Sequence, residues 1–180
     1  GDYGYYNEER DSTYVTGHAL MKEYSKGDTL FMHGRQIEGF VKIDSIVTPA
    51  DTVAGTAESV RIDSTHVSVV YPRVRFYRSD MQGICDSLRV TEADSTMRMF
   101  VSPVVWSEDR QISGRVIAVH FNDSTYDRVN IPEQAFTADH IEDQYYNQIS
   151  GKEMVARFVD GELRFLDISG NVEIISYPEE

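Results

Sequence analysis

The sequence predicts an all-β protein, organised as a single elongated domain of stacked antiparallel strands. Three observations predict this class. A module of strand, turn and strand recurs three times in the second half of the chain. Within its strands, apolar and polar residues alternate with a period of two, the pattern of a pleated strand with one buried face. No window of twelve or more residues keeps the apolar stripe of an amphipathic helix behind a capped start.

Each copy of the module opens at a glycine that follows a polar residue. The copies read GICDSLRV from Gly83, GRVIAVHF from Gly114 and GKEMVARF from Gly151. A polar turn follows in each copy, then a second strand, which reads MRMFV, YDRVNI or LRFLDI. The residues twenty-one places after the three glycines are Val104, Ala135 and Val172, so the copies stay in register. Repeats of this length built from strand pairs are typical of a stacked, solenoid-like β architecture.

The first half of the chain is predicted as a polar lead-in followed by strand after strand. Residues 1–13 lack a period, and we expect an extended lead-in that is partly ordered by Tyr3, Tyr5 and Tyr6. From Tyr14 the strand regions are VTGHALMKEYS, TLFMHG and IEGFVKIDSIV, with a turn at residues 26–28. Residues 48–58, which are rich in small side chains, are predicted to form a loop. Residues 14–180 are therefore predicted to form one domain.

Two later segments are less regular. In SVRIDSTHVSVVYPRVRFYRS, Pro72 predicts a strand that lies at a sheet edge or is interrupted there. The segment FTADHIEDQYYNQ, residues 136–148, is the one candidate for a short helix, and it fits a long polar loop equally well.

Alternation within the repeats assigns side chains to faces. One face of the first strands carries Leu88 and Val90, then Val119 and Phe121, then Ala156 and Phe158. The other face carries Ser87 and Arg89, Ala118 and His120, and Val155 and Arg157. In the second strands the shared faces are Met97, Met99 and Val101, and Val129 and Ile131. In the third copy Leu163 and Phe165 point one way, so Leu166 and Ile168 point the other way unless a bulge intervenes.

Composition excludes several classes of function. The 180 residues include 17 basic and 30 acidic ones, and the net charge of −13 argues against nucleic acid as a partner. The single cysteine, Cys85, excludes an internal disulfide and a multi-cysteine metal site, and we expect a packed free thiol. No stretch approaches the ~18 apolar residues of a transmembrane helix. No signal peptide is recognisable, and the first residue, Gly1, suggests a trimmed or processed chain.

No pattern of an active site or metal centre stands out. The five histidines form neither HxH nor HExxH, so no zinc site is predicted. Neighbouring carboxylates are expected by chance in so acidic a chain, and GxSxG is absent. We therefore predict a protein that is not an enzyme and has no cofactor.

The repeats resemble the OstA/LptA-like domain of lipopolysaccharide export. The resemblance is carried by SGRVIAVHF with NDSTYDRVNIPEQAF, by SGKEMVARFVDGELRFLDISGNVEII, and by TGHALMKEYSKGDTLFMHG, whose D-T/S-L opens the next strand. The stretch from FYRSDMQG to DRQISG is similar to versions of the domain in Bacteroides-like bacteria. The resemblance covers roughly residues 14–177.

The resemblance implies a V-shaped, slightly open β jelly roll in the periplasm, alone or as part of the outer-membrane translocon. It implies that the acyl chains of lipopolysaccharide (lipid A) lie between two sheets, whereas sugar and phosphate stay in water. It also implies that domains join end to end through edge strands, including head-to-tail self-association, and that there are no catalytic residues. The inward face inferred above then supplies the acyl-chain lining: Leu88, Val90, Met97, Met99, Val104, Trp106, Ile117, Val119, Phe121, Met154, Ala156, Phe158 and Val172.

The net charge departs from what a lipopolysaccharide-binding surface needs. Contact with phosphates would require basic residues at the rim of the groove, for which the candidates are Arg73, Arg75, Arg78, Arg110 and Arg115. The acidity is compatible with acyl-chain binding and weak headgroup contact, which would favour release and onward transfer.

Two other functions fit the same pattern. The apolar faces are also those of any closed β sandwich, in which case the protein is an assembly module that acts through its edge strands. Alternatively the chain is a carbohydrate-binding β jelly roll. Trp106 fits packing in a core or groove, but clustering of Trp106 with surface tyrosines would favour sugar stacking.

Overall fold

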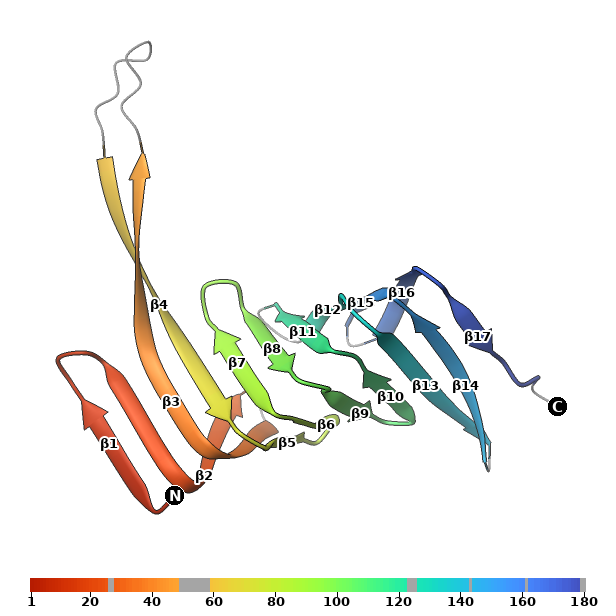
Figure 1. Ribbon diagram of the computed structural model, residues 1–180, viewed down its shortest axis with the longest axis horizontal. Coiled ribbons are helices and arrows are strands. Elements are labelled where there is room, and N and C mark those ends of the chain that lie inside the picture. Colours follow the sequence, from red (N-terminus) through yellow and green to blue (C-terminus); the bar gives the residue numbers. More distant parts are fainter. Residues whose placement is uncertain (26–27, 49–58, 123–125, 143, 161, 179–180) are drawn as a thin grey trace, which may run out of the picture.

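The computed structural model describes residues 1–25, 28–48, 59–122, 126–142, 144–160 and 162–178. The described residues form seventeen strands, all paired antiparallel, and no helix, so the predicted all-β class of elongated, stacked antiparallel strands is confirmed (Figure 1). The strands are β1 (Tyr3–Asn7), β2 (Ser12–Ser25), β3 (Asp28–Thr48), β4 (Ser59–Tyr71), β5 (Val74–Arg78), β6 (Met81–Cys85), β7 (Ser87–Thr91), β8 (Thr96–Phe100), β9 (Val104–Ser107), β10 (Arg110–Ser113), β11 (Val116–Phe121), β12 (Tyr126–Ile131), β13 (Ala135–Glu142), β14 (Tyr145–Gly151), β15 (Glu153–Val159), β16 (Glu162–Ser169) and β17 (Glu173–Ile175).

The strands pair as two long ladders. In the first ladder the order is β1, β2, β3, β4, β7, β8, β11, β12, β15 and β16. In the second ladder it is β2, β3, β5, β6, β9, β10, β13, β14 and β17. The long strands β2 and β3 contribute to both. From β5 onward a hairpin in one ladder alternates with a hairpin in the other, which is the structural basis of the sequence repeat.

The chain passes between the ladders at tight corners. Gly17 (φ 71°) and Gly170 (φ 75°) take the left-handed conformation at two of them, which glycine adopts without steric cost. Backbone hydrogen bonds close equivalent corners, from Arg115 N to Glu133 O at 3.0 Å and from Lys152 N to Ser169 O at 2.9 Å. The two ladders are therefore joined along one side.

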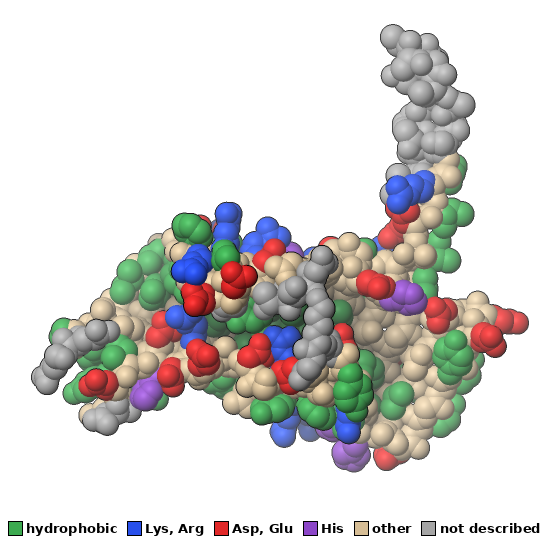
Figure 2. All heavy atoms as spheres, turned by 180° about the vertical axis from the view of Figure 1, so that it is seen from behind, with side chains coloured by type: hydrophobic (Ala, Val, Ile, Leu, Met, Phe, Trp, Pro, Cys, Tyr) green, Lys and Arg blue, Asp and Glu red, His purple; other side chains and the backbone are tan. Residues whose placement is uncertain are grey.

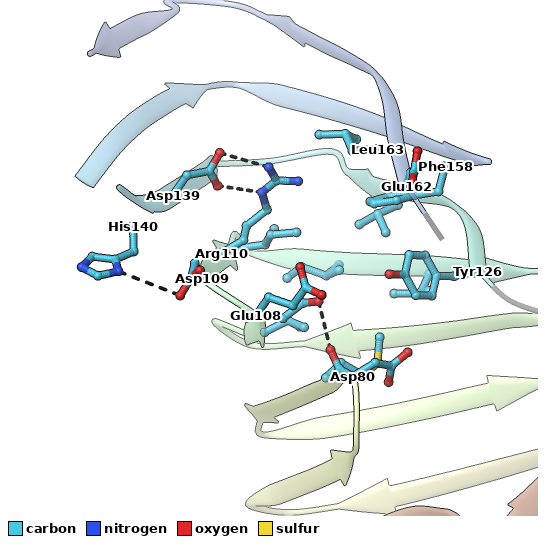
Figure 3. A pocket seen from close by; sticks show the side chains of 17 residues that line it. Asp80, Glu108, Asp109, Arg110, Tyr126, Asp139, His140, Phe158, Glu162 and Leu163 are labelled. Carbon is cyan, nitrogen blue, oxygen red and sulfur yellow. Dashed lines mark hydrogen bonds and ion pairs between the residues drawn. The ribbon is translucent and has the colours of Figure 1, made fainter. Parts of the chain in front are cut away.

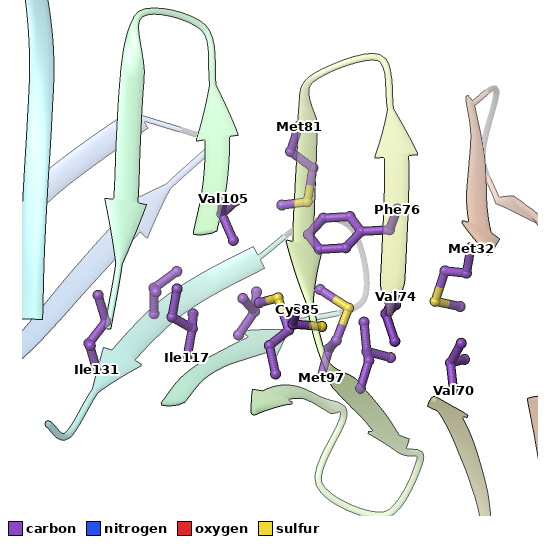
Figure 4. Close-up of a cluster of buried hydrophobic side chains, with 14 of the residues drawn as sticks. Met32, Val70, Val74, Phe76, Met81, Cys85, Met97, Val105, Ile117 and Ile131 are labelled. Carbon is purple, nitrogen blue, oxygen red and sulfur yellow. The ribbon is translucent and has the colours of Figure 1, made fainter. Parts of the chain in front are cut away.

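The core fills the space between the ladders (Figure 4). In the first ladder a row of directly paired, buried side chains runs through Ile37, Val70, Leu88, Met99 and Ile117. From the second ladder a shorter row, Met32, Phe76 and Val105, packs into the same cluster. Cys85 is also buried and free, as predicted.

The outer halves of β3 and β4 form a two-stranded ribbon that projects from the body (Figures 1 and 2). We call residues 41–48 and 59–66 the arm. One face of the arm carries Ile43 (66% exposed) and Ile62 (69% exposed), and it continues the inward face that carries Ile37 in the body. The opposite face carries charges, which include ion pairs of Lys42 with Asp44 and of Arg61 with Asp63. Most of the predicted loop, residues 49–58, lies outside the described residues.

Two predictions about local structure are corrected. The lead-in contains a strand, because β1 pairs with β2 from Tyr3↔Thr16 to Asn7↔Ser12. Residues 136–148 form neither a helix nor a long loop but parts of the paired strands β13 and β14. Most of their polar residues are only partly buried or exposed, whereas Thr137 is buried on the inner face.

The third copy of the module contains a bulge, which is one of the two alternatives that its sequence allowed. The register between β15 and β16 shifts so that Phe158 pairs with Leu163 and Arg157 with Phe165. Leu163, Leu166 and Ile168 all pack against the core, whereas Phe165 is 65% exposed. The bulge therefore restores apolar residues to the inner face of β16.

The first copy of the module is out of register with the other two. Gly114 and Gly151 directly precede corner residues, and a Cβ at either position would collide with Ile131 or Ile168. Gly83 instead lies inside β6, under the ring of Phe76. Cys85 occupies the position before the corner in the first copy.

Candidate functional site: the cavity between the ladders

A cavity of about 600 Å³ lies between the two ladders in the C-terminal half of the molecule (Figure 3). The second ladder contributes lining residues from β6, β9, β10 and β13, and the first ladder contributes them from β11, β12, β15 and β16. The cavity lies on the inner face, where the repeats place their apolar side chains. It exists because the core side chains that face each other here do not fill the space between the ladders.

The floor of the cavity is apolar. It is formed by Val105 and Ile112 of the second ladder and by Ile117, Val119, Val129, Phe158 and Leu163 of the first. The Tyr126 ring packs edge-on against Phe158, with ring centroids 4.8 Å apart. Burial, with a smaller contribution from Asp80, raises the pKa of the Tyr126 hydroxyl. This neutral hydroxyl has no recorded hydrogen-bond partner among the described residues, so it is available to a ligand carbonyl.

The rim of the cavity is acidic. Its carboxylates are Asp80, Glu108, Asp109, Asp139 and Glu162. The Arg110 guanidinium lies among them and donates two hydrogen bonds to Asp139, from Nε at 2.6 Å and from Nη2 at 3.1 Å (Figure 3). His140 Nδ1 lies 3.9 Å from Asp109 Oδ1. Because Arg110 is already paired with a carboxylate, the rim as a whole repels anions.

The cavity continues into a narrow apolar recess. Its walls include Ile131, Met154, Ala156 and Leu166, and its free volume is only about 10 Å³. Methionine side chains adapt readily to different shapes, so Met154 is the wall residue best suited to widen the recess around an inserted chain.

The predicted lining residues fall into four groups. Ile117, Val119 and Phe158 line the cavity, and Met154 and Ala156 line its recess. Leu88, Met97 and Met99 are buried in the part of the core that has no cavity, with Val90 and Phe121 packed against the core. Val172 lies 44% exposed beside the last strand. Val104 and Trp106 form the fourth group.

The prediction that Val104 and Trp106 face inward is wrong. Val105, between them, is buried in the core, so its two neighbours point to the outer face of β9. The segment from Cys85 to Pro103 is three residues shorter than the equivalent segment from Gly114 to Ala135, and this odd difference exchanges the two faces. Aligning the first copy on Pro103, which is buried at the place of Ala135 in the next copy, would have assigned the faces of β9 correctly.

On the outer face, Trp106 lies in a shallow hollow of about 300 Å³ with Phe31, Tyr77 and Ile84. Its indole Nε1 donates a hydrogen bond of 2.9 Å to Gln111 Oε1. Arg75 and Gln82 also line the hollow, and no carboxylate does.

Of the five candidate rim arginines, only Arg110 lines the cavity. Arg78 is bound to Asp80 and Arg115 to Glu133. Arg73 stands at a corner with φ 59°, and Arg75 belongs to the outer hollow. Of these candidates the structure therefore places one at the rim, and that one is already paired with Asp139.

Among the described residues, no group of three or more histidine, cysteine or carboxylate side chains is placed to hold a metal ion. Over the same residues, no helix is long and apolar enough to cross a membrane. No protein-family model, no curated protein and no solved structure matches the chain.

Proposed function

We propose that this chain is a periplasmic domain of lipopolysaccharide export that holds acyl chains between its two ladders and passes them toward the outer membrane. The observation that carries the proposal is the apolar cavity between the ladders, on the face that the repeats keep apolar. Each methylene group that enters such a space contributes ~0.8 kcal/mol. The resemblance of the repeats to the OstA/LptA-like family supports the choice of lipid.

The acidic rim suits transfer better than storage. A phosphorylated headgroup would meet carboxylates at the mouth of the cavity and only one arginine, which is already paired. Binding would then depend on the acyl chains, while the headgroup stays in water. A ligand held in this way is released more readily than one whose phosphates are bound by arginine.

Photo-crosslinking in a gram-negative host tests the proposal. A photoreactive residue replaces Phe158, which lines the cavity, and the control probe replaces its neighbour Val159, which is 51% exposed and points away from the cavity. We expect a lipopolysaccharide adduct at position 158 and none at 159. Absence of an adduct at 158 in folded, exported protein would instead favour an assembly module without lipid.

The two ends of the stack are suited to end-to-end joining. The first ladder ends in β1 on one side and in β16 on the other, and each presents an unpaired edge among the described strands. Such edges can pair with a strand of another domain. We propose head-to-tail association in which β16 of one copy pairs with β1 of the next.

Engineered cysteines test this association, because the native Cys85 is buried. One preparation carries Tyr5→Cys in β1 and another carries Phe165→Cys in β16, both at exposed positions. A bis-maleimide reagent should link the two when they are mixed. A mixture of Phe165→Cys with Ile43→Cys, on the arm, should give no such product. Equal linking in both mixtures would contradict the arrangement.

Carbohydrate binding is a second candidate function, favoured by one observation. Trp106 shares the outer hollow with Tyr77, which is 55% exposed, on a rigid sheet. Aromatic rings of this kind can stack on the apolar faces of sugars, and Gln82 and Arg75 can hydrogen-bond to hydroxyl groups. Because Trp106 is the single tryptophan, its fluorescence reports on this hollow alone. A saturable change with lipid-free oligosaccharides, lost in Tyr77→Ala, would support the candidate; an unchanged spectrum would exclude it.

A further inference from the structure

Four arginines lie on the outer face of the first ladder and form two directly opposed pairs. Arg89 of β7 pairs with Arg98 of β8, and Arg128 of β12 pairs with Arg157 of β15. Their neighbours Leu88, Met99, Val129 and Ala156 are buried on the inner face, so the four guanidinium groups belong to the opposite face. We call these four residues the arginine patch.

The patch is electrostatically costly. Like charges directly opposite each other on a sheet are destabilising. An ion pair with a carboxylate is recorded for Arg98, which binds Asp94 at 2.6 Å, but for none of the other three within the described parts of the chain. Arg89 also has a buried Nε atom without a hydrogen-bond partner there. Among the described residues, three of the four cations therefore form no ion pair, in a protein with a net charge of −13.

The residues between the two pairs are neutral. His120 of β11 contacts Thr96 Oγ1 through Nδ1 at 3.0 Å and the Asn130 side-chain amide through Nε2 at 3.2 Å. Because the Thr96 hydroxyl donates to Asp94 O, His120 Nδ1 carries the hydrogen and Nε2 accepts one from Asn130. Burial and then Arg128 and Arg98 lower the pKa of His120, in agreement with a neutral ring. The neighbouring carboxylates are Asp94, which is bound to Arg98, and the exposed Asp127.

The spacing of the pairs indicates the kind of ligand. Strand β11 separates β8 from β12, and Arg98 lies opposite Ala118 whereas Arg128 lies opposite His120, so the two arginines are two strand spacings and two residues apart, about 12 Å. Planar guanidinium groups bind phosphate through two parallel hydrogen bonds, and a single phosphate can accept from both members of a pair. We propose that the arginine patch binds phosphoryl groups, one at each arginine pair. The carriers that present this chemistry are a phosphorylated lipid surface and a soluble phosphorylated molecule.

This site is independent of the acyl-chain cavity. The cavity opens on the inner face among carboxylates, whereas the patch lies on the outer face of the same strands. Failure of lipid crosslinking at position 158 would leave the patch untouched, and failure of phosphate binding would leave the cavity untouched.

Thermal unfolding of the whole chain with pyrophosphate tests the proposal, with sodium chloride at matched ionic strength as the reference. We expect pyrophosphate to raise the Tm, because a ligand of the folded state stabilises it. The double variant Arg128→Gln/Arg157→Gln should weaken pyrophosphate binding about tenfold or more. Without ligand this variant should be no less stable than the parent protein, because it removes two opposed cations.

Matched control variants separate specific binding from net charge. The double variant Arg61→Gln/Arg164→Gln makes the same charge change at arginines that pair with Asp63 and Glu162, and it should keep the response to pyrophosphate. Flotation with vesicles containing phosphatidylglycerol identifies the carrier: vesicle binding that depends on the patch indicates a lipid surface, and a response to pyrophosphate alone indicates a soluble ligand. No patch-dependent binding in either assay, or equal losses in both double variants, would overturn the proposal.

Discussion

At the residue scale, the corners on the inner face tolerate few substitutions, because core side chains lie directly against the backbone there. Gly114 and Gly151 leave room for an isoleucine in the second strand of the hairpin that follows each of them, Ile131 or Ile168, which lies where a Cβ atom would be. Cys85, which takes the equivalent place in the first copy, is buried in the core and has no disulfide partner. Single residues at the corners therefore determine the packing, and burial suppresses the reactivity of the one that carries a thiol, Cys85.

The Cys85 thiol should be unreactive in the folded protein. Burial, with a smaller effect of Asp86, raises its pKa to about 12, so the reactive thiolate is scarce at neutral pH. We expect Ellman's reagent to modify Cys85 only after denaturation. Rapid modification of the native protein would show that the corner opens frequently.

Replacement of Gly114 by alanine should destabilise the fold by ~1–3 kcal/mol, because the added methyl group collides with Ile131. The matched control is Gly39→Ala in β3, where the nearest atom to a new Cβ is Thr13 Cβ at 3.9 Å. That control should be neutral or should stabilise by up to ~1 kcal/mol, because alanine loses less backbone entropy. Free energies of unfolding from urea titrations distinguish the two; equal effects would contradict this account of the repeat glycine.

At the element scale, each strand serves two surfaces. β9 places Val105 in the core and Trp106 in the outer hollow, and β15 places Ala156 in the core and Arg157 in the arginine patch. Period-two alternation was readable in the sequence for most strands. It failed before Val104, where an odd change in length exchanges the two faces, and it left the face of Leu166 and Ile168 open, because a bulge has the same effect.

The arm is the element whose apolar residues are least coupled to the core. Ile43→Ala on the arm should change the free energy of unfolding by no more than ~0.5 kcal/mol, because Ile43 is 66% exposed. Ile37→Ala, on the same strand and face but 8% exposed, should cost ~2–5 kcal/mol. Denaturant titration of both variants gives the comparison. A large cost at Ile43 would mean that the arm packs against another surface in solution.

At the scale of the whole molecule, the fold is a stack in which each strand contacts mainly its neighbours in the ladder. Central strands such as β8 and β11 are flanked on both sides, whereas β1 and β17 have one partner each among the described strands. In such stacks the free energy of unfolding is close to a sum of contributions from neighbouring strands, so the strands at the two ends of the stack open first.

Hydrogen exchange should follow this order. We expect the slowest amide exchange in β7, β8 and β11 and the fastest in the arm, β1 and β17, because opening an end breaks one interface and opening the centre breaks two. Mass spectrometry of peptides after deuterium labelling measures it. Uniform protection from end to end would indicate a single cooperative unit instead, or end strands covered by association.

The sequence by itself determined the all-β class, the stacked modules and most of the inward apolar face, because these follow from periodicity and from local preferences of strands and turns. It did not determine the strands at Tyr3–Asn7 and in residues 136–148, because a polar strand is held by its pairing partner and not by its own pattern. Only the tertiary structure decided that the inner face is closed around Leu88 and Met99 but hollow beside Phe158. The free space depends on how two ladders distant in sequence approach each other. The arginine patch has the same origin, since strand register alone brings Arg128 beside Arg157.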